Sequence, residues 1–304
     1  MQLLKLIQLY FYVCEVYDAK LRSLVHRHTK NGLAPQFTDQ EVLTVYLFGV
    51  GYEKRLQLKE LHRCMAHHYA DCFPDLPSYE AFNQRLNRLN PVFAPLLAGL
   101  VMKWQAQARA GQDELFLLTD SMPIVTCSGR RYGVVAPEVT DKGFNAAKKM
   151  HFWGVKLHSI SLSIKGALPA VSYLMVSPAS EHDLTAQRNL LEENKDTYAF
   201  ADKAFKDNSL EDSFIAAGGK LFIPIKQRQG QSVTDKQRHR AADDLYSKMV
   251  SSIRQPIESF FGWLIERTDI QRAAKVRSTK GLLVHIFGKI TAAIYRRMDE
   301  LKLI

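Results

Sequence analysis

Leu115-Phe116-Leu117-Leu118-Thr119-Asp120 is a short apolar run that ends on a carboxylate, which is typical of a buried strand. Tyr198-Ala199-Phe200-Ala201-Asp202 repeats this pattern 82 residues later. A third acid, Glu258, follows after another 56 residues, in a basic and aromatic stretch with helical periodicity that also carries Arg254. This order predicts that two strands and a late helix bring three carboxylates together.

The segments around these acids alternate between strand and helix patterns. Strands are predicted over residues 115–118, 151–162, 167–176, 198–201 and 220–225, and helices over 184–193, 209–217, 247–266 and 279–301. The order resembles that of the ribonuclease-H-like fold, in which the first and fourth strands are neighbours. We therefore expect an α/β domain over residues 111–304, with a mixed five-stranded sheet and flanking helices.

Residues 1–110 are predicted to form a separate all-α domain. Thr38-Asp39-Gln40-Glu41 is a capping box that predicts the start of an apolar helix. Ser78 can cap a later helix that runs to Leu89 and carries Arg85 and Arg88 away from its apolar stripe. We expect this region to bind DNA ends as a helix-turn-helix, although any small helical bundle would show a similar pattern.

The charge balance favours a polyanionic partner. The net charge is +10 over 304 residues, and the pI is about 9.3. The excess lies in residues 203–304, with net charge +8, and in residues 1–110, with +4, whereas residues 111–202 carry −2. Four cysteines do not make a secreted disulfide framework, and no apolar run approaches the ~20 residues of a membrane span. These features predict a cytoplasmic protein that binds nucleic acid and does not enter a membrane.

The three acids have the chemistry that a two-metal site requires. Two hard divalent ions about 3.5–4 Å apart need bridging and terminal carboxylate oxygens. Asp120 would bridge both ions, while Asp202 and Glu258 would each hold one. Each acid also has an ordinary structural explanation: a turn residue for Asp120, a helix cap for Asp202 and an ion pair with Arg254 for Glu258. Their joint occurrence in this element order favours the metal site.

Basic residues near the acids are candidates for contacts with phosphates, which dominate the affinity of proteins for DNA. The candidates are Arg254, Lys226, Arg228, Arg238, Arg240 and Arg267, together with Arg85 and Arg88 of the N-terminal region. The alternative for the segment from Lys226 to about Asp244 is a solvated basic loop.

Three segments in this order resemble the bacterial insertion-sequence transposases of the DDE class. They are Leu117–Ser121, Phe200–Phe205 and Arg254–Phe261. The resemblance implies a ribonuclease-H-like catalytic domain that uses Mg2+, two ions with Mn2+ able to substitute, to cut DNA at the ends of its own element. The freed 3′ ends would then be joined to target DNA. Because two ends require two active sites, a homodimer on DNA is expected, in the cytoplasm at the nucleoid.

The chain departs from this family's pattern at two positions. Many relatives have Tyr where Ser251 stands, and Lys or Arg where Ile265 stands, with Arg267 two residues further on. Two other functions would use parts of the same machinery: a stand-alone metal-dependent nuclease, and a non-catalytic sequence-specific DNA-binding protein derived from a transposase. The presence of all three acids counts against the second.

Overall fold

The structure is a computed structural model that describes residues 2–25, 35–110, 115–131, 133, 135–145, 148–225 and 233–304, the last range without side chains for 233–239. Contacts divide the chain into two units. Unit 1 comprises Met1–Lys103, Val134–Glu138 and Leu264–Ile304, and unit 2 comprises Trp104–Gly133 and Val139–Trp263. In this division the helices after residue 264 group with the N-terminal helices, and the boundary between residues 110 and 111 stays a prediction from the sequence.

Unit 1 is helical and is organised around α2 (Asp39–Gly51), which is buried along most of its length. The predicted capping box is confirmed, because the Thr38 hydroxyl accepts from the Glu41 amide while the Glu41 carboxylate accepts from the Thr38 amide. The other elements are α1 (Gln2–Val16), η1 (Tyr17–Leu21), η2 (Arg22–Leu24), α3 (Leu58–His68), α4 (Tyr79–Arg88), most of α5 (Asn90–Ala110), α9 (Thr279–Leu283), η5 (Val284–Gly288) and α10 (Lys289–Glu300).

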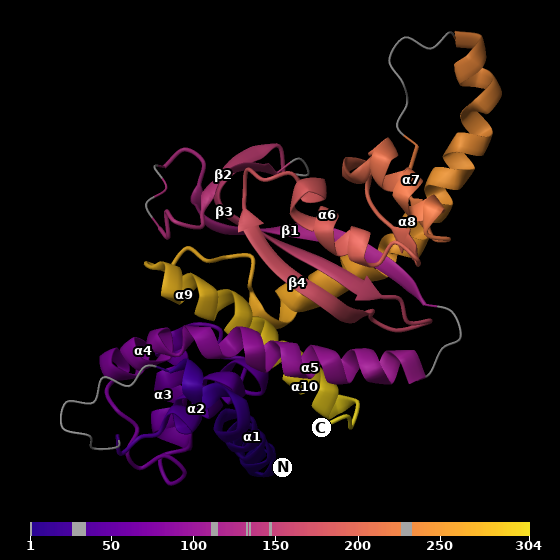
Figure 1. Ribbon diagram of the computed structural model, residues 1–304. Coiled ribbons are helices and arrows are strands. Elements are labelled where there is room, and N and C mark those ends of the chain that lie inside the picture. Colours follow the sequence, from indigo (N-terminus) through magenta and orange to yellow (C-terminus); the bar gives the residue numbers. More distant parts are fainter. Residues whose placement is uncertain are drawn as a thin grey trace. The chain divides into compact units, whose positions relative to one another are not determined.

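Unit 2 is built on a mixed sheet of six strands with flanking helices (Figure 1). The strands are β1 (Phe116–Ser128), β2 (Asp141–Asn145), β3 (Met150–Leu162), β4 (Ala170–Pro178), β5 (Tyr198–Phe200) and β6 (Lys220–Phe222). The helices are α6 (Asp183–Glu193), η4 (Lys203–Phe205), α7 (Asn208–Ala216) and most of α8 (Val233–Thr268). This α/β sheet, with an all-helical N-terminal region, is consistent with the ribonuclease-H-like fold predicted from the sequence.

The strand β3 is the centre of the antiparallel part of the sheet. It pairs with β1 along one edge, and β2 and β4 follow one another along its other edge. On the far side of β1, β5 and then β6 run parallel to it. The prediction that the first strand lies beside the strand at 198–201 is therefore confirmed.

The structure differs from the sequence predictions in strand β2, in the length of β1 and in the start of α8. The strand β2 was not predicted, because its only buried residue is Gly143 and it is defined by pairing with β3. The strand β1 continues past Asp120 to Ser128, where its buried residues alternate. Proline has no amide hydrogen to donate to a neighbouring strand. Pro123 is tolerated because β5 pairs with β1 only as far as Leu118, so this edge of β1 has no β5 partner at Pro123.

The predicted basic loop is helical from Val233 onward, so α8 starts about four turns earlier than expected. Residues 233–244 are rich in Lys, Arg, Gln and Ala, which favour helix even where no apolar stripe marks one.

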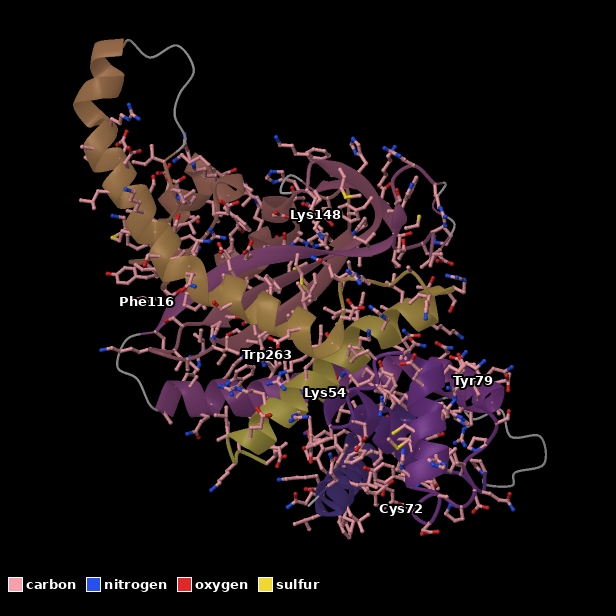
Figure 2. All side chains as sticks on the ribbon, turned by 180° about the vertical axis from the view of Figure 1, so that it is seen from behind. Lys54, Cys72, Tyr79, Phe116, Lys148 and Trp263 are labelled. Carbon is pink, nitrogen blue, oxygen red and sulfur yellow. The ribbon has the colours of Figure 1, made fainter. Side chains whose placement is uncertain are left out.

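Helices α6 and α8 cover opposite faces of the sheet. In Figure 1 α6 lies in front of β1 and β3, and in Figure 2, seen from behind, α8 crosses in front of β1 with Trp263 on it. Successive residues of β1 confirm this arrangement, since Thr119 bonds to Gln187 of α6 and Asp120 contacts Arg254 of α8.

Candidate acidic site

The pairing of β1 with β5 places two of the predicted acids at equivalent positions. Leu118 is opposite Phe200 in the parallel register, and Asp120 and Asp202 each follow two residues later. Side chains two residues apart in a strand point to the same face, so Asp120 and Asp202 are placed on the same face of the sheet as Leu118 and Phe200. The predicted juxtaposition of these two acids is thus a direct result of strand register.

The two aspartates differ in their surroundings. Asp120 lies within β1 with its side chain 23% exposed, and it accepts a hydrogen bond from the Ser121 amide. Asp202 follows β5, is 52% exposed, and accepts from the Lys203 amide at 2.6 Å as the cap of η4. The capping role considered from the sequence is therefore present, alongside a position beside Asp120.

The third acid is brought to the same place by α8. Glu258 lies one turn after Arg254, and the Arg254 guanidinium contacts all three carboxylates. Its nitrogens lie 3.4 Å from Asp120, 3.9 Å from Asp202 and 4.0 Å from Glu258. One cation thus joins acids from two strands and a helix.

Arg254 occupies an unusual position for an arginine. It is 5% exposed and takes its place in the buried stripe of α8 between Val250 and Ile257. Its Nε atom is buried and has no hydrogen-bond partner among the residues that the structure describes. A charged group is normally excluded from such a stripe, so its burial here depends on the carboxylates around it.

The electrostatics of the site are dominated by burial and by like charge. The pKa of Asp120 is raised from 3.8 to about 6, mainly by burial and also by the nearby charges of Asp202 and Glu258, while Arg254 and the Ser121 amide oppose the rise. Three carboxylates around one guanidinium leave an excess of negative charge when all are ionised. An oxygen-rich site with such an excess matches what hard divalent cations require.

In the conformation described, no three His, Cys, Asp or Glu side chains of the described residues are arranged to hold a metal ion. The three predicted acids surround the Arg254 guanidinium instead. The donor types fit a divalent cation, whereas their present spacing is set by the guanidinium.

A buried polar network that was not predicted from the sequence supports β1 on the opposite face. The Thr119 hydroxyl donates to the Gln187 side chain, Gln187 bonds to His158 Nδ1 at 3.1 Å, and His158 Nε2 bonds to the Ser177 hydroxyl at 2.8 Å. Burial lowers the pKa of His158 from 6.5 to about 4, so the imidazole is neutral. The signal that could have revealed this network is the polar residues Thr119, His158 and Ser177 at buried positions of otherwise apolar strands.

The basic residues predicted to contact DNA lie in several places. Arg240 is exposed on α8, 3.8 Å from Asp244, and Arg267 is half-buried in the last turn of the same helix. Arg238 lies on α8, but its side chain is outside the described residues, as are Lys226 and Arg228 altogether.

Two further candidates lie on α4 in unit 1. Arg85 is half-buried, where it donates to the Phe37 carbonyl and pairs with Asp39 at 2.7 Å. Arg88 is exposed. Of these two arginines, only Arg88 has a side chain free of a structural partner in the contacts described.

The mixed sheet with its flanking helices is consistent with a ribonuclease-H-like domain. The chain belongs to the transposase DDE domain family, whose profile matches residues 111–294. Searches of the curated proteins and of the solved structures found no match. None of the described helices is both long and apolar enough to cross a membrane.

Proposed function

We propose that this chain is a transposase that cuts DNA at the ends of its own element and joins the 3′ ends to target DNA. Asp120, Asp202 and Glu258 are its catalytic acids. The observation that carries the proposal is the contact of all three acids with one guanidinium, although they come from β1, the end of β5 and α8. Membership of the transposase DDE domain family supports the reaction class.

The acids are the residues that would hold Mg2+, or Mn2+ in its place. All three acids lie within 4.0 Å of one guanidinium, and Asp120, Asp202 and Glu258 would together hold these ions. When bound, two such ions would activate the attacking oxygen and stabilise the leaving oxygen of the phosphodiester.

The protein's own part is to place DNA against these acids. Arg254 and the exposed cations of α8 supply positive charge near carboxylates that would otherwise repel phosphate. The helical region, residues 1–110, would bind the element ends, and a homodimer on DNA would act on two ends together. We place this activity in the cytoplasm, at the nucleoid.

The test is cleavage and joining of a labelled duplex that carries the terminal sequence of the element, with Mg2+ present. Asp120→Asn, Asp202→Asn and Glu258→Gln are expected to bind the duplex like wild type but to lose both products. Glu266→Gln changes an exposed acid on the same helix and serves as the matched control, with wild-type products expected.

Other outcomes would identify a different function. Cleavage without joined product would indicate a stand-alone nuclease. Binding without cleavage by the wild type would indicate a DNA-binding protein derived from a transposase. Wild-type cleavage by the three acid variants would show that the site lies elsewhere.

A further inference from the structure

The contacts of Arg254 are those of a counter-ion rather than of a specific hydrogen-bonded pair. Its distances of 3.4, 3.9 and 4.0 Å to the three carboxylates exceed the roughly 2.7–2.9 Å of a charge-assisted hydrogen bond. By contrast, Arg85 pairs with Asp39 at 2.7 Å. Arg254 therefore neutralises the charge of three acids and forms a short hydrogen-bonded pair with none of them.

The position of Arg254 on the helix keeps it at the cluster. Its Cα is fixed one turn from Glu258, within the buried stripe that includes Val250 and Ile257. Because the charge is attached to the same helix as one of the acids, it competes for the carboxylates as an intramolecular group. A divalent cation approaching from solution must overcome this competition.

The acids need such a charge before any metal is bound. Asp120 is largely buried, and it lies with Asp202 and Glu258 around the one guanidinium of Arg254. Without a cation between them, three carboxylates at this spacing would repel one another and destabilise the contact between α8 and β1.

We propose that Arg254 is a tethered counter-ion, which holds the three carboxylates together before metal loading and must be displaced when divalent cations bind. The inference rests on the proposed function, since it assigns the same acids to the metal. It predicts that the metal affinity of the site is lower than the three acids alone would give.

Mn2+ binding to the full chain without DNA, followed by electron paramagnetic resonance, measures this competition. Arg254→Met removes the charge but keeps an unbranched side chain, and it is expected to bind Mn2+ about tenfold or more tightly than wild type. Arg254→Lys keeps the charge and is expected to remain near wild type. Arg267→Met removes another α8 arginine, which forms no ion pair with the three acids among the described residues, and it serves as the control with unchanged Mn2+ affinity. Unchanged or weaker Mn2+ binding by Arg254→Met would overturn the inference.

A second measurement tests the counter-ion role without metal. In EDTA, Arg254→Met is expected to lower the Tm, and adding Asp120→Asn to it is expected to restore part of the loss, so the two substitutions are not additive. Additive effects would overturn the inference whatever the metal result. The Tm measurement also tests the inference if Arg254→Met alone fails to fold. Folding of the double variant would then show that Arg254 and Asp120 interact in the folded protein.

The two proposals fail in different ways. If Asp120→Asn leaves Mn2+ binding unchanged, the metal is not held by these acids, and the proposed catalytic site is wrong. If Asp120→Asn abolishes Mn2+ binding but Arg254→Met does not strengthen it, the acids hold the metal and only the counter-ion role is wrong.

Discussion

Thr119 and Asp120 are adjacent in β1, yet they connect two separate polar clusters on opposite faces of the sheet. Thr119 donates to Gln187 of α6, and Asp120 lies 3.4 Å from Arg254 of α8. One peptide unit therefore links the buried network of His158 to the acidic site. Any change that shifts this part of β1 toward one face moves the carboxylate on the other.

Gln187→Leu is expected to destabilise the protein through this network. The substitution leaves the Thr119 hydroxyl and His158 Nδ1 without their partner in a fully buried setting, which costs roughly 1–3 kcal/mol in the free energy of unfolding. Asn189→Leu replaces an exposed amide on the same helix, and it should change this free energy by less than about 0.5 kcal/mol. Urea denaturation measures both. Equal effects of the two substitutions would show that the network does not stabilise the sheet.

The neutral His158 predicts a pH dependence of stability. Its pKa is about 4 in the folded chain and 6.5 ordinarily, so between these values only the unfolded chain takes up the proton. The contribution of His158 to the free energy of unfolding should therefore fall as pH decreases from 6.5 to 4, by up to about 1.4 kcal/mol per pH unit.

Asp120, with its pKa raised to about 6, acts in the opposite direction between pH 3.8 and 6, so His158 must be isolated by comparison. His158→Gln keeps polar atoms in the network but cannot titrate. Over this window the slope of the unfolding free energy against pH should be lower for His158→Gln than for wild type, by about one proton, or roughly 1.4 kcal/mol per pH unit. Identical slopes would show that folding does not lower the pKa of His158.

Two glycines predict opposite outcomes on substitution by alanine. A Cβ at Gly154 of β3 would lie 2.0 Å from the Ile124 carbonyl oxygen of β1, so Gly154→Ala must separate the strands and should cost about 3 kcal/mol or more. Gly262 is exposed in α8 with open space at its Cβ position, and Gly262→Ala should stabilise by up to about 1 kcal/mol. Thermal denaturation of both variants tests the pairing of β1 with β3. A stable Gly154→Ala protein would contradict the register.

The two arginines of α4 should separate a structural role from DNA binding. Arg85→Met removes the ion-pair partner of the buried Asp39, which also accepts from the Tyr17 hydroxyl, and should lower the free energy of unfolding by roughly 2 kcal/mol or more. Arg88→Met should leave stability within about 0.5 kcal/mol of wild type. If Arg88 contacts a phosphate, its loss should reduce the slope of log affinity against log salt by about 0.9. Fluorescence anisotropy on labelled duplex measures this slope. A stable Arg85→Met protein with weakened DNA binding would reverse the two assignments.

Much of the sheet could be predicted because its signals are local. The apolar runs that end at Asp120 and Asp202 marked β1 and β5, and the Thr38 capping box marked the start of α2. These patterns lie within a few residues, so propensity and hydrogen-bonding capacity specify them directly.

The remainder depends on contacts between distant residues. Thr119 and Gln187 lie 68 residues apart, and no pattern within either segment shows that they meet. The sequence alone allows Glu258 and Arg254 to form a surface ion pair. In the structure Arg254 is buried and also contacts Asp120, so the pair is part of the acidic site. The strand β2 exists because β3 is long enough to pair with two strands in succession along one edge.

The parallel pairing of Leu118 with Phe200 also sets the order of events during synthesis. These residues lie 82 positions apart, and such long-range pairings form late in folding because a large loop must first close. The ribosome releases Asp120 well before Asp202, and Glu258 comes later still, on the same helix as Arg254. A growing chain therefore has no assembled acidic site until α8 is complete. Under the proposed function, the protein would thus stay inactive through most of its own translation.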